Sequence, residues 1–434
     1  MRSLAAVVTA LLVVLGGGSI VASASASASA EEVNPWLDMR VMNMAHSGGE
    51  DEAPMNTLYA FKRAKALGAD MLELDVQSTQ DGRLVVIHDA TVDRTTEGSG
   101  RVVDMTLAEV QRLDAAHWFV PGRSAVHGEP ADSYPLRGAR DGDVVVDGYA
   151  PDDFAVPTLD EVLGAFPDTP INIEIKGTRD SDLDSYLRTG RLLSDLINRS
   201  GRTDIIVGSF SDAALADFHT HSPQIGLSTG RQATTDYVIA GTPPPPGTVA
   251  LQVPVNQLGF RVITPELVER AHRDGLAVHA WFSGTAPDDA DTYSMIIDTC
   301  VDGLMPAKPS VLEEILDARG IERPGSGLSG TVPGCGTPAP TSSDPSTTDD
   351  TSTTDPTSTT DPTSTTDPTS TSHATSTSHA TSTTAPTSPR TPALVQTDSQ
   401  DAPGIAWWLV VGPAVLAAAL VLSQSVRTTR GRHR

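Results

Sequence analysis

Residues Leu72–Asp89 read LELDVQSTQDGRLVVIHD, and this stretch decides the fold. Apolar residues alternate with Glu73 and Asp75 in its first half, so both carboxylates share one face of a predicted strand. A second apolar arm follows Asp81-Gly82 and ends at His88. Because Asp-Gly favours a two-residue hairpin turn, the arms pair about that turn. This pairing places Asp75 opposite His88, with Cβ atoms about 4.5–5.5 Å apart.

Two like charges on one face of a strand repel each other. Their burial is costly unless a cation lies between them. A surface hairpin with solvated acids is the alternative. The mainly apolar flanks instead favour strands that are buried on both faces. The stretch therefore predicts a cation site with an imidazole beside it.

The two ends of the 434-residue chain differ from its middle. Residues 1–30 contain an Arg, an apolar run and an Ala-Ser-Ala exit, which predicts a secretory signal peptide rather than an uncleaved anchor. Residues 404–423 are apolar and are predicted to form a membrane helix. The basic tail 424–434 is predicted to be cytoplasmic. A sortase anchor is the alternative, but no LPxTG-like motif precedes the span. We expect a single-pass protein of the cell membrane with an extracellular catalytic domain.

Residues 335–403 are rich in Ser, Thr, Pro and Asp, and TTDPTS recurs there in tandem. This composition cannot bury enough apolar surface to fold, so it predicts a disordered stalk. The net charge of -25, with no basic cluster outside the tail, argues against nucleic acid as a partner. Cys300 and Cys335 are the two cysteines, and they can pair in an oxidising compartment.

Residues 31–334 remain for one folded domain, in which predicted strands and helices alternate. Eight βα units predict a (β/α)8 TIM barrel with an insertion, residues 89–157, after the second strand. A doubly wound open sheet is the alternative, but no Gly-rich phosphate loop follows the first strand. The predicted strands are 41–46, 70–76, 171–176, 204–210, 224–229, 249–253, 276–282 and 301–305. The predicted helices are 56–67, 158–166, 182–198, 211–220, 234–239, 264–274, 288–299 and 310–318.

The active site of such a barrel lies at the C-terminal ends of its strands. Three carboxylates near those ends suit a hard cation, Ca²⁺ or Mg²⁺, better than zinc. A lysine offsets charge on a phosphate, and two imidazoles can act as base and acid. A glycosidase also needs paired acids, but it needs no lysine or histidine pair. The residues concerned are His46, Glu73, Asp75, His88, Glu174 and Lys176, with His279 and Trp281 on the seventh strand; the direction in which His279 points is left open.

Several ordered motifs between Met42 and Pro309 resemble those of the glycerophosphodiester phosphodiesterase family. The motifs are His46-Ser-Gly-Gly, Ala53-Pro-Met-Asn-Thr57, Glu73-Leu-Asp75, Val86-Ile-His88-Asp89, Asp93-Arg-Thr-Thr96 and Glu174-Ile-Lys176. The resemblance implies a barrel enzyme that hydrolyses glycerophosphodiesters to glycerol phosphate and an alcohol with a divalent cation. Its substrate is expected to be a glycerophosphodiester or a glycerol-phosphate polymer.

The resemblance also implies roles for individual side chains. Two histidines act as base and acid, three carboxylates hold the metal, and a lysine and an aromatic residue contact the substrate. In this chain these are His46 as base, His88 as acid, Glu73, Asp75 and Glu174 as metal ligands, and Lys176 and Trp281 at the substrate.

Two positions depart from the family pattern. Ser47 stands where the family usually has the Arg of His-Arg-Gly, and Met55 stands where it has the Glu of Pro-Glu-Asn-Thr. Glu50 or Glu52, from the same loop, would then replace the missing acid. Two alternative functions remain: a phospholipase-type enzyme that forms a cyclic phosphate, and a surface-binding barrel that has lost catalysis.

Overall fold

The computed structural model describes residues 34–38, 41–283, 286–321 and 335. None of the helices in this part of the chain has the length and apolar sequence that a membrane span requires. The predicted signal peptide, the stalk beyond Cys335, the membrane helix and the basic tail lie outside the described residues.

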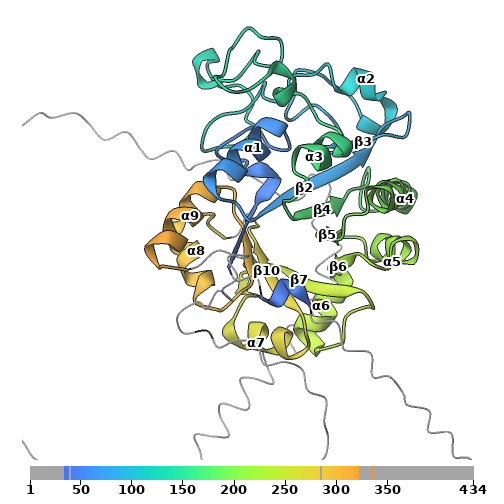
Figure 1. Ribbon diagram of the computed structural model, residues 1–434, viewed down its shortest axis with the longest axis vertical. Coiled ribbons are helices and arrows are strands. Elements are labelled where there is room, and N and C mark those ends of the chain that lie inside the picture. Colours follow the sequence, from blue (N-terminus) through green and yellow to red (C-terminus); the bar gives the residue numbers. More distant parts are fainter. Residues whose placement is uncertain (1–33, 39–40, 284–285, 322–334, 336–434) are drawn as a thin grey trace, which may run out of the picture. The chain divides into compact units, whose positions relative to one another are not determined.

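Within the described residues, eight parallel strands close into a barrel (Figure 1). β1 pairs with β2 on one side and with β11 on the other, which closes the sheet. The predicted parallel barrel is therefore confirmed, and the open sheet is excluded. The barrel strands are β1 (Met42–Ala45), β2 (Met71–Ser78), β4 (Ile171–Ile175), β5 (Ile205–Gly208), β6 (Gly226–Ser228), β7 (Thr248–Pro254), β10 (Ala277–Trp281) and β11 (Gly303–Met305).

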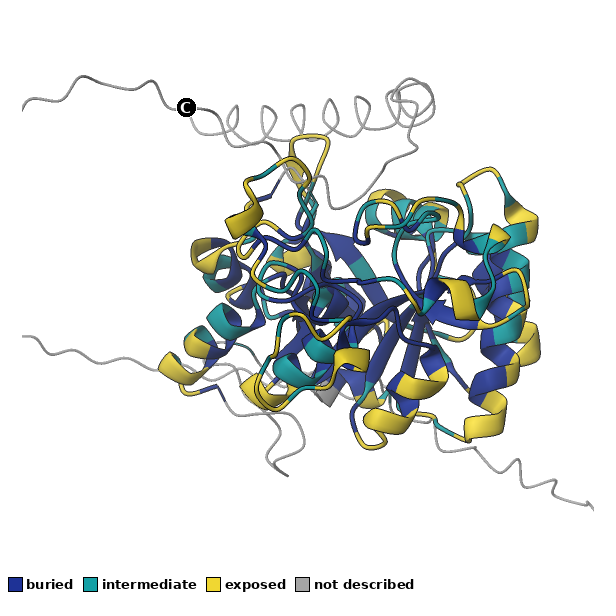
Figure 2. Ribbon diagram, turned by 90° about the horizontal axis from the view of Figure 1, so that it is seen from above, coloured by how far each residue is buried: buried dark blue, intermediate teal, exposed yellow. Residues whose placement is uncertain are grey.

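A helix follows each barrel strand along the chain, as the predicted alternation requires. Burial colours show buried strands surrounded by helices whose outer faces are exposed (Figure 2). Side-chain oxygens cap several helix starts; the capping box of Thr158 and Glu161 is one case. The helices are α1 (Leu58–Leu67), α3 (Leu159–Ala165), α4 (Leu183–Ser200), α5 (Asp212–His221), α6 (Arg231–Ala240), α7 (Pro265–Arg273), α8 (Ala290–Ile297) and α9 (Pro309–Ala318).

The barrel interior changes from apolar to polar along the strands. One apolar cluster joins side chains of six barrel strands to Trp36 and Leu37 of the short helix η1 (Pro35–Asp38). Because alternate residues of a strand share a face, Glu73 and Asp75 follow the buried Met71 on the same face of β2. The strand residues of this cluster are Met42, Met44, Met71, Ile206, Ala250, Ala277 and Met305.

His279, whose direction the sequence left open, lies in the barrel interior. Its Nδ1 is 3.3 Å from Nε2 of Gln252, and that amide donates to Oδ1 of Asn172 at 2.8 Å. A Cβ atom added to Gly303 would lie 3.2 Å from the His279 ring, so the glycine leaves room for it. Burial lowers the pKa of His279 to about 3, and the ring is neutral in the folded protein.

The hairpin that follows β2 has a different register from the predicted one. β3 (Leu84–Val86) pairs antiparallel with β2, with Val76 opposite Val86, one residue away from the predicted pairing. The reason is a three-residue loop in which Thr79 N–H donates to Arg83 O and Gly82 alone takes the left-handed conformation, with φ 72°. The predicted Asp75–His88 pair is therefore wrong as a strand pair.

His88 nevertheless remains close to Asp75. β3 ends at Val86, and the backbone N–H of Ile87 donates to Asp75 O at 3.0 Å. The carbonyl of His88 then accepts from the Gln77 side chain at 3.3 Å. The chain thus leaves the strand pair before it reaches His88. His88 therefore stays close to Asp75 although the register of the pair differs from the predicted one.

The predicted insertion between β3 and α3 is confirmed. It contains α2 (Leu107–Val110) and three 3-10 turns, η3 (Val102–Asp104), η4 (Ala131–Ser133) and η5 (Pro151–Phe154), and it lies beyond the outer ends of β2 and β3 (Figure 1). Its aromatic residues serve packing: Trp118 stacks on His127 at 4.2 Å, and Arg137 lies 3.7 Å from the Tyr134 ring. A second small hairpin, β8 (Asn256–Gln257) and β9 (Phe260–Arg261), follows β7.

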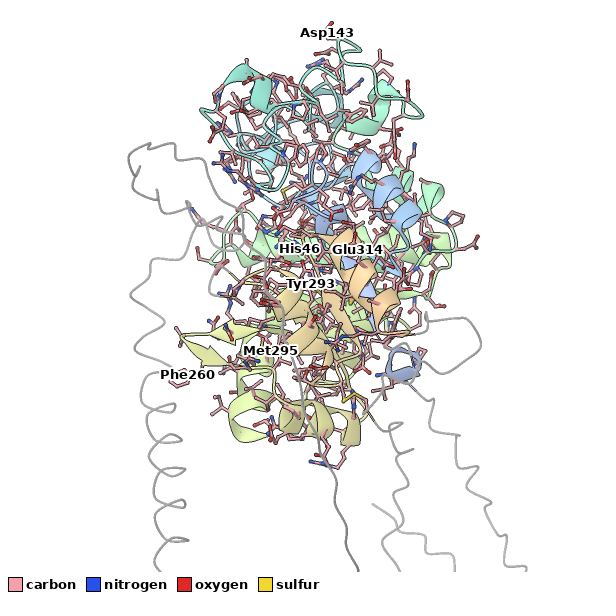
Figure 3. The ribbon with its side chains drawn as sticks, turned by 90° about the vertical axis from the view of Figure 1, so that its left-hand side faces the viewer. His46, Asp143, Phe260, Tyr293, Met295 and Glu314 are labelled. Carbon is pink, nitrogen blue, oxygen red and sulfur yellow. A yellow bond between two sulfur atoms is a disulfide. The ribbon has the colours of Figure 1, made fainter. Side chains whose placement is uncertain are left out.

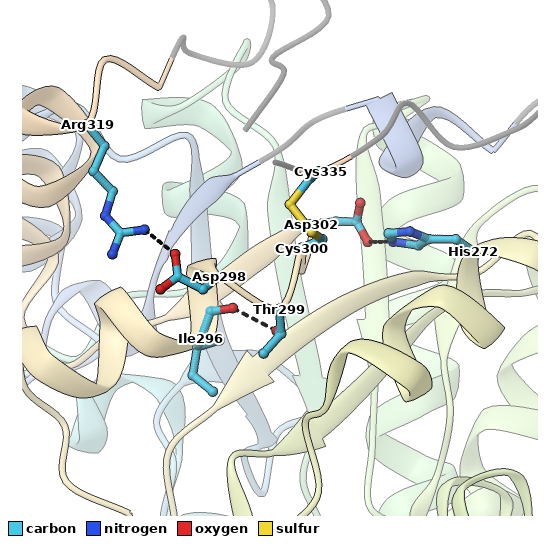
Figure 4. Close-up of a disulfide and its surroundings, with 8 residues drawn as sticks. All are labelled: His272, Ile296, Asp298, Thr299, Cys300, Asp302, Arg319 and Cys335. Carbon is cyan, nitrogen blue, oxygen red and sulfur yellow. Dashed lines mark hydrogen bonds and ion pairs between the residues drawn. A yellow bond between two sulfur atoms is a disulfide. The ribbon is translucent and has the colours of Figure 1, made fainter. Parts of the chain in front are cut away.

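Cys300 and Cys335 form the predicted disulfide (Figure 4). The bond joins residues 35 positions apart and ties Cys335 to the end of the barrel domain. By restricting the unfolded chain, a link of this span contributes about 3–4 kcal/mol to folding stability. The nearby Asp302 carboxylate, fully buried, accepts from Nε2 of His272 at 2.7 Å and from the Val278 N–H.

We predict that His279 makes the barrel sensitive to acid. Its pKa is lowered on folding, so only the unfolded chain takes up its proton between pH 6.5 and about 3. Stability is therefore lost as pH falls below 6.5, by about 1.4 kcal/mol per pH unit. Urea unfolding of the full chain and of His279→Gln at pH 7 and pH 5 measures this. The variant should lose about 2 kcal/mol less than the parent between these pH values; equal losses in the two proteins would contradict the prediction.

Candidate active site

Three acidic side chains meet between the middle of β2 and the C-terminal end of β4. Glu73 and Asp75 are two residues apart on β2, and Glu174 of β4 is in register with Asp75. One oxygen from each of the three lies within 4.8 Å of the others. Glu73 and Asp75 are only 3% and 1% exposed. The structure therefore brings the predicted acidic triad together inside the mouth of the barrel.

Burial makes these acids unequal. Burial and the neighbouring Asp75 raise the pKa of Glu73 to about 8. Burial also opposes ionisation of Asp75, but the charges of Lys176 and His88 outweigh it and lower its pKa. Lys176 Nζ lies 3.2 Å from Asp75 Oδ1 and 2.9 Å from Glu174 Oε2. Lys176 and His88 thus favour the ionised form of Asp75, whereas burial and the charge of Asp75 disfavour the ionised form of Glu73.

The loop after β1 supports the two carboxylates of β2. Ser47 N–H donates to Glu73 Oε2 at 2.8 Å, and its hydroxyl lies 3.3 Å from Asp75 Oδ2. The Asn56 amide donates to the same Asp75 oxygen at 2.8 Å. Ser47 and Asn56 both have positive φ, 47° and 57°. The sequence did not indicate these contacts. Asn56 directly precedes Thr57, the residue that caps α1.

His46 lies where β1 ends, in the 3-10 turn η2 (His46–Gly48), and Figure 3 labels it. Its Nε2 is 3.9 Å from Glu73 Oε2, and its Nδ1 is 3.1 Å from Glu50 Oε1. Burial opposes the charged ring, but the carboxylates of Glu50, Glu73 and Asp75 outweigh it and raise the pKa of His46 well above its ordinary value. A cation that neutralised Glu73 and Asp75 would remove part of this effect.

His88 lies on the Asp75 side of the site. Its Nδ1 is 2.7 Å from Asp89 Oδ1, and Asp89 also accepts from Arg94 at 2.6 and 2.9 Å. Burial opposes ionisation of Asp89, but these hydrogen bonds outweigh it and lower the pKa. An ionised Asp89 can only accept, so the Nδ1–H of His88 donates to it. The Asp89 carboxylate therefore fixes the Nδ1 side of the His88 ring.

Lys176 and Trp281 meet an aromatic residue that the sequence did not indicate. Lys176 Nζ lies 5.7 Å from the centre of the Phe210 ring, and Phe210 meets Trp281 edge to face at 5.8 Å. Phe210 follows β5 and Trp281 ends β10, so both stand at the C-terminal ends of barrel strands. A single phenylalanine in a strand pattern gives no signal of such a contact.

The two departures from the family pattern have clear structural contexts. Met55 is buried, and Arg94 Nη1 lies 3.2 Å from its sulfur. Of the two acids that the sequence offered as replacements, Glu50 contacts His46, whereas Glu52 pairs with Arg63 at 2.8 Å. Of these two acids of the loop, Glu50 is therefore the one whose carboxylate lies in the site.

The acidic triad fits a divalent cation. Its oxygens converge, two of its carboxylates are buried, and oxygen ligands are those that Ca²⁺ and Mg²⁺ prefer. Burial and the charge of Asp75 raise the pKa of Glu73, and a cation between the acids would oppose that rise. A site with converging acids, two imidazoles and a lysine can bind a phosphate and move protons to and from its oxygens.

Comparisons with known proteins agree with this geometry. Residues 46–309 match the glycerophosphoryl diester phosphodiesterase family. A glycerophosphodiester phosphodiesterase of Caldanaerobacter subterraneus subsp. tengcongensis is 33% identical over 280 residues, which are 63% of this chain and 97% of that protein. A glycerophosphodiester phosphodiesterase of Bacillus subtilis is 27% identical over 297 residues, 64% of this chain and 86% of that protein.

A solved structure from Silicibacter pomeroyi DSS-3 has the same fold. Its TM-score is 0.50 at 22% identity, and the match covers 65% of this chain and 95% of that one. At this identity the likeness concerns the barrel alone. The match of residues 46–309 includes both predicted catalytic histidines, the acidic triad and Lys176. The chain therefore belongs to the glycerophosphoryl diester phosphodiesterase family, and it is a phosphoric diester hydrolase.

Proposed function

We propose that the site hydrolyses glycerophosphodiesters with His46 as general base and His88 as general acid. One observation carries this assignment of roles: two imidazoles, each hydrogen-bonded through Nδ1 to a carboxylate, lie beside the same acidic triad. Proton transfer to and from each ring would then take place at Nε2, because Nδ1 contacts a carboxylate. Neither a cyclising reaction nor a decayed site has a specific observation in its favour.

The proposed reaction moves two protons and exchanges one bond at phosphorus. His46 takes a proton from the attacking water as its oxygen bonds to phosphorus. His88 gives its Nε2 proton to the leaving alcohol oxygen as the second phosphorus–oxygen bond breaks. Lys176, 8% exposed, offsets negative charge on the phosphate. The products are glycerol phosphate and a neutral alcohol.

Glu73, Asp75 and Glu174 would hold the divalent cation, Ca²⁺ or Mg²⁺. When bound, it supplies positive charge that polarises the phosphate and stabilises the charge of the transition state. Such a cation would favour the ionised form of Glu73, whose pKa is raised by burial. Ser47 and Asn56 orient the two β2 carboxylates toward one place by the hydrogen bonds described above.

We also propose that the barrel acts outside the cell. Residues 1–30 would export the chain, the stalk 335–403 would hold the barrel away from the bilayer, and residues 404–423 would anchor it. The Cys300–Cys335 bond supports this proposal, because disulfides persist in oxidising compartments. In this location the substrate is a glycerophosphodiester or a glycerol-phosphate polymer at the surface.

We predict that activity depends on a divalent cation held by the triad. Chelation of the full-length protein should abolish turnover, and Ca²⁺ or Mg²⁺ should restore it. Glu174→Gln removes one ligand charge and should weaken cation binding at least about tenfold in calorimetric titration. Glu269→Gln, the same change at a solvent-exposed position of α7, is the control and should bind as the parent does. Full turnover in excess chelator would exclude the proposed metal role.

We predict that His88→Ala affects substrates according to their leaving group. An alkyl alcohol needs a proton as it leaves, so kcat should fall about 10²–10⁴-fold. A nitrophenyl diester of glycerol phosphate needs no such proton and should lose less than about tenfold. His46→Ala should slow both substrates, because water is activated in each case. Equal losses for the two substrates in His88→Ala would exclude it as the general acid.

We predict that protease added to intact producing cells degrades the barrel and spares a tag placed after Arg434. With residues 404–423 in the membrane, the tail would lie inside the cell and the residues before the span outside. Immunoblots against the barrel and the tag measure this, and permeabilised cells, in which the tag is also lost, are the control. A barrel that resists protease until the cells are permeabilised contradicts the proposed location.

A further inference from the structure

Glu50 occupies a defined position beside the proposed base. Its carboxylate is buried, with 4% of the side chain exposed, and Oε1 lies 3.1 Å from Nδ1 of His46. We propose that Glu50 is the positioning residue of His46: it accepts the Nδ1 proton, fixes the ring, and directs Nε2 toward the reacting water. This inference rests on the proposed function, in which His46 is the base.

The backbone conformation of the loop places Glu50 next to the His46 imidazole. Gly48 and Gly49 both have positive φ, 83° and 91°, and Gly49 N–H donates to His46 O at 2.7 Å. A Cβ atom at Gly48 would lie 2.7 Å from Cβ of Ala60, and one at Gly49 would lie 2.7 Å from the Pro309 ring. Other side chains would not fit against these elements, so the packing fixes the loop in which Glu50 follows His46 by four residues.

The acids that follow Glu50 have different partners. Asp51 pairs with Lys308 at 3.0 Å, and Glu52 pairs with Arg63 at 2.8 Å and accepts from Ser310. These three partners lie on α1 or at the start of α9, away from His46. Among these three consecutive acids, Glu50 is the one that contacts a proposed catalytic side chain.

The contact has a chemical consequence for the ring. A carboxylate that accepts from Nδ1 holds the neutral imidazole in the tautomer whose Nε2 has a free lone pair. That Nε2 lies 3.9 Å from Glu73 Oε2, on the side of the acidic triad. Asp89 makes the matching contact with Nδ1 of His88. Each proposed proton carrier thus has its own carboxylate, which is Glu50 for His46 and Asp89 for His88.

Kinetics of Glu50 variants in the full-length protein test the role. Glu50→Ala should lower kcat about 10²-fold with KM changed less than about twofold, because Glu50 acts through the base and does not touch the substrate. Glu50→Gln retains an oxygen that accepts from Nδ1, and it should recover kcat to within about tenfold of the parent. Glu52→Gln alters the same loop away from His46 and should keep kcat within about twofold.

A purely structural role predicts a different pattern. Both Glu50 variants would then yield less folded protein, while kcat per folded molecule would stay at the parent value. Glu50→Ala with kcat within twofold of the parent therefore overturns the proposal. Equal losses in Glu50→Ala and Glu50→Gln overturn it as well, because the amide oxygen would have no effect.

A second measurement keeps this inference separate from the proposed reaction. Ring ¹⁵N spectra of the full chain, labelled at histidine and with Ca²⁺ added, report the tautomer of His46, whose signals are assigned by their loss in His46→Gln. In spectra recorded above the pKa of His46, the proton should lie on Nδ1 in the parent and be shared between both nitrogens in Glu50→Ala. Identical spectra overturn the positioning role. An inactive parent whose spectra change as expected would contradict the proposed reaction alone.

Discussion

Repulsion between carboxylates at the mouth of the barrel is the constraint on which the site depends. Glu73 and Asp75 share one face of β2, and both are almost fully buried. Burial removes the water that would screen them, so both acids ionise together only if positive charge lies nearby. Lys176 supplies one charge, and with it the pKa of Glu73 still rises to about 8. The protein therefore holds an acidic cluster that its own cations only partly neutralise.

The same constraint accounts for the unusual backbone around the site. Ser47 and Asn56 adopt the left-handed backbone conformation, which residues other than glycine rarely take. This conformation costs about 1–3 kcal/mol for each residue. In return, a backbone N–H reaches Glu73 and an amide reaches Asp75. Hydrogen bonds to an ionised carboxylate are among the strong ones, and they fix the direction of its oxygens. Part of the backbone strain of the described residues therefore lies where the ligands must be held.

The fold and the triad were predictable because they follow from local periodicity. Alternation along β2 and β4 places Glu73, Asp75 and Glu174 on interior positions, and parallel register brings them together. The hairpin register was not predictable, since Asp81-Gly82 suits both a two-residue and a three-residue loop. The direction of His279 was also open, because it depends on the barrel interior and on the room left by Gly303.

The contact of Glu50 with His46 could not be read from the sequence either, because it depends on how two glycines turn the loop. An acid at position 55 would approach from the start of α1, whereas Glu50 approaches from within the loop itself. Since Gly48 and Gly49 pack against α1 and α9, the loop has little freedom to place Glu50 elsewhere. Met55 itself contacts Arg94, so the carboxylate beside His46 is supplied by Glu50. A loop that departs from the family motif at position 55 thus still places an acid next to the proposed base.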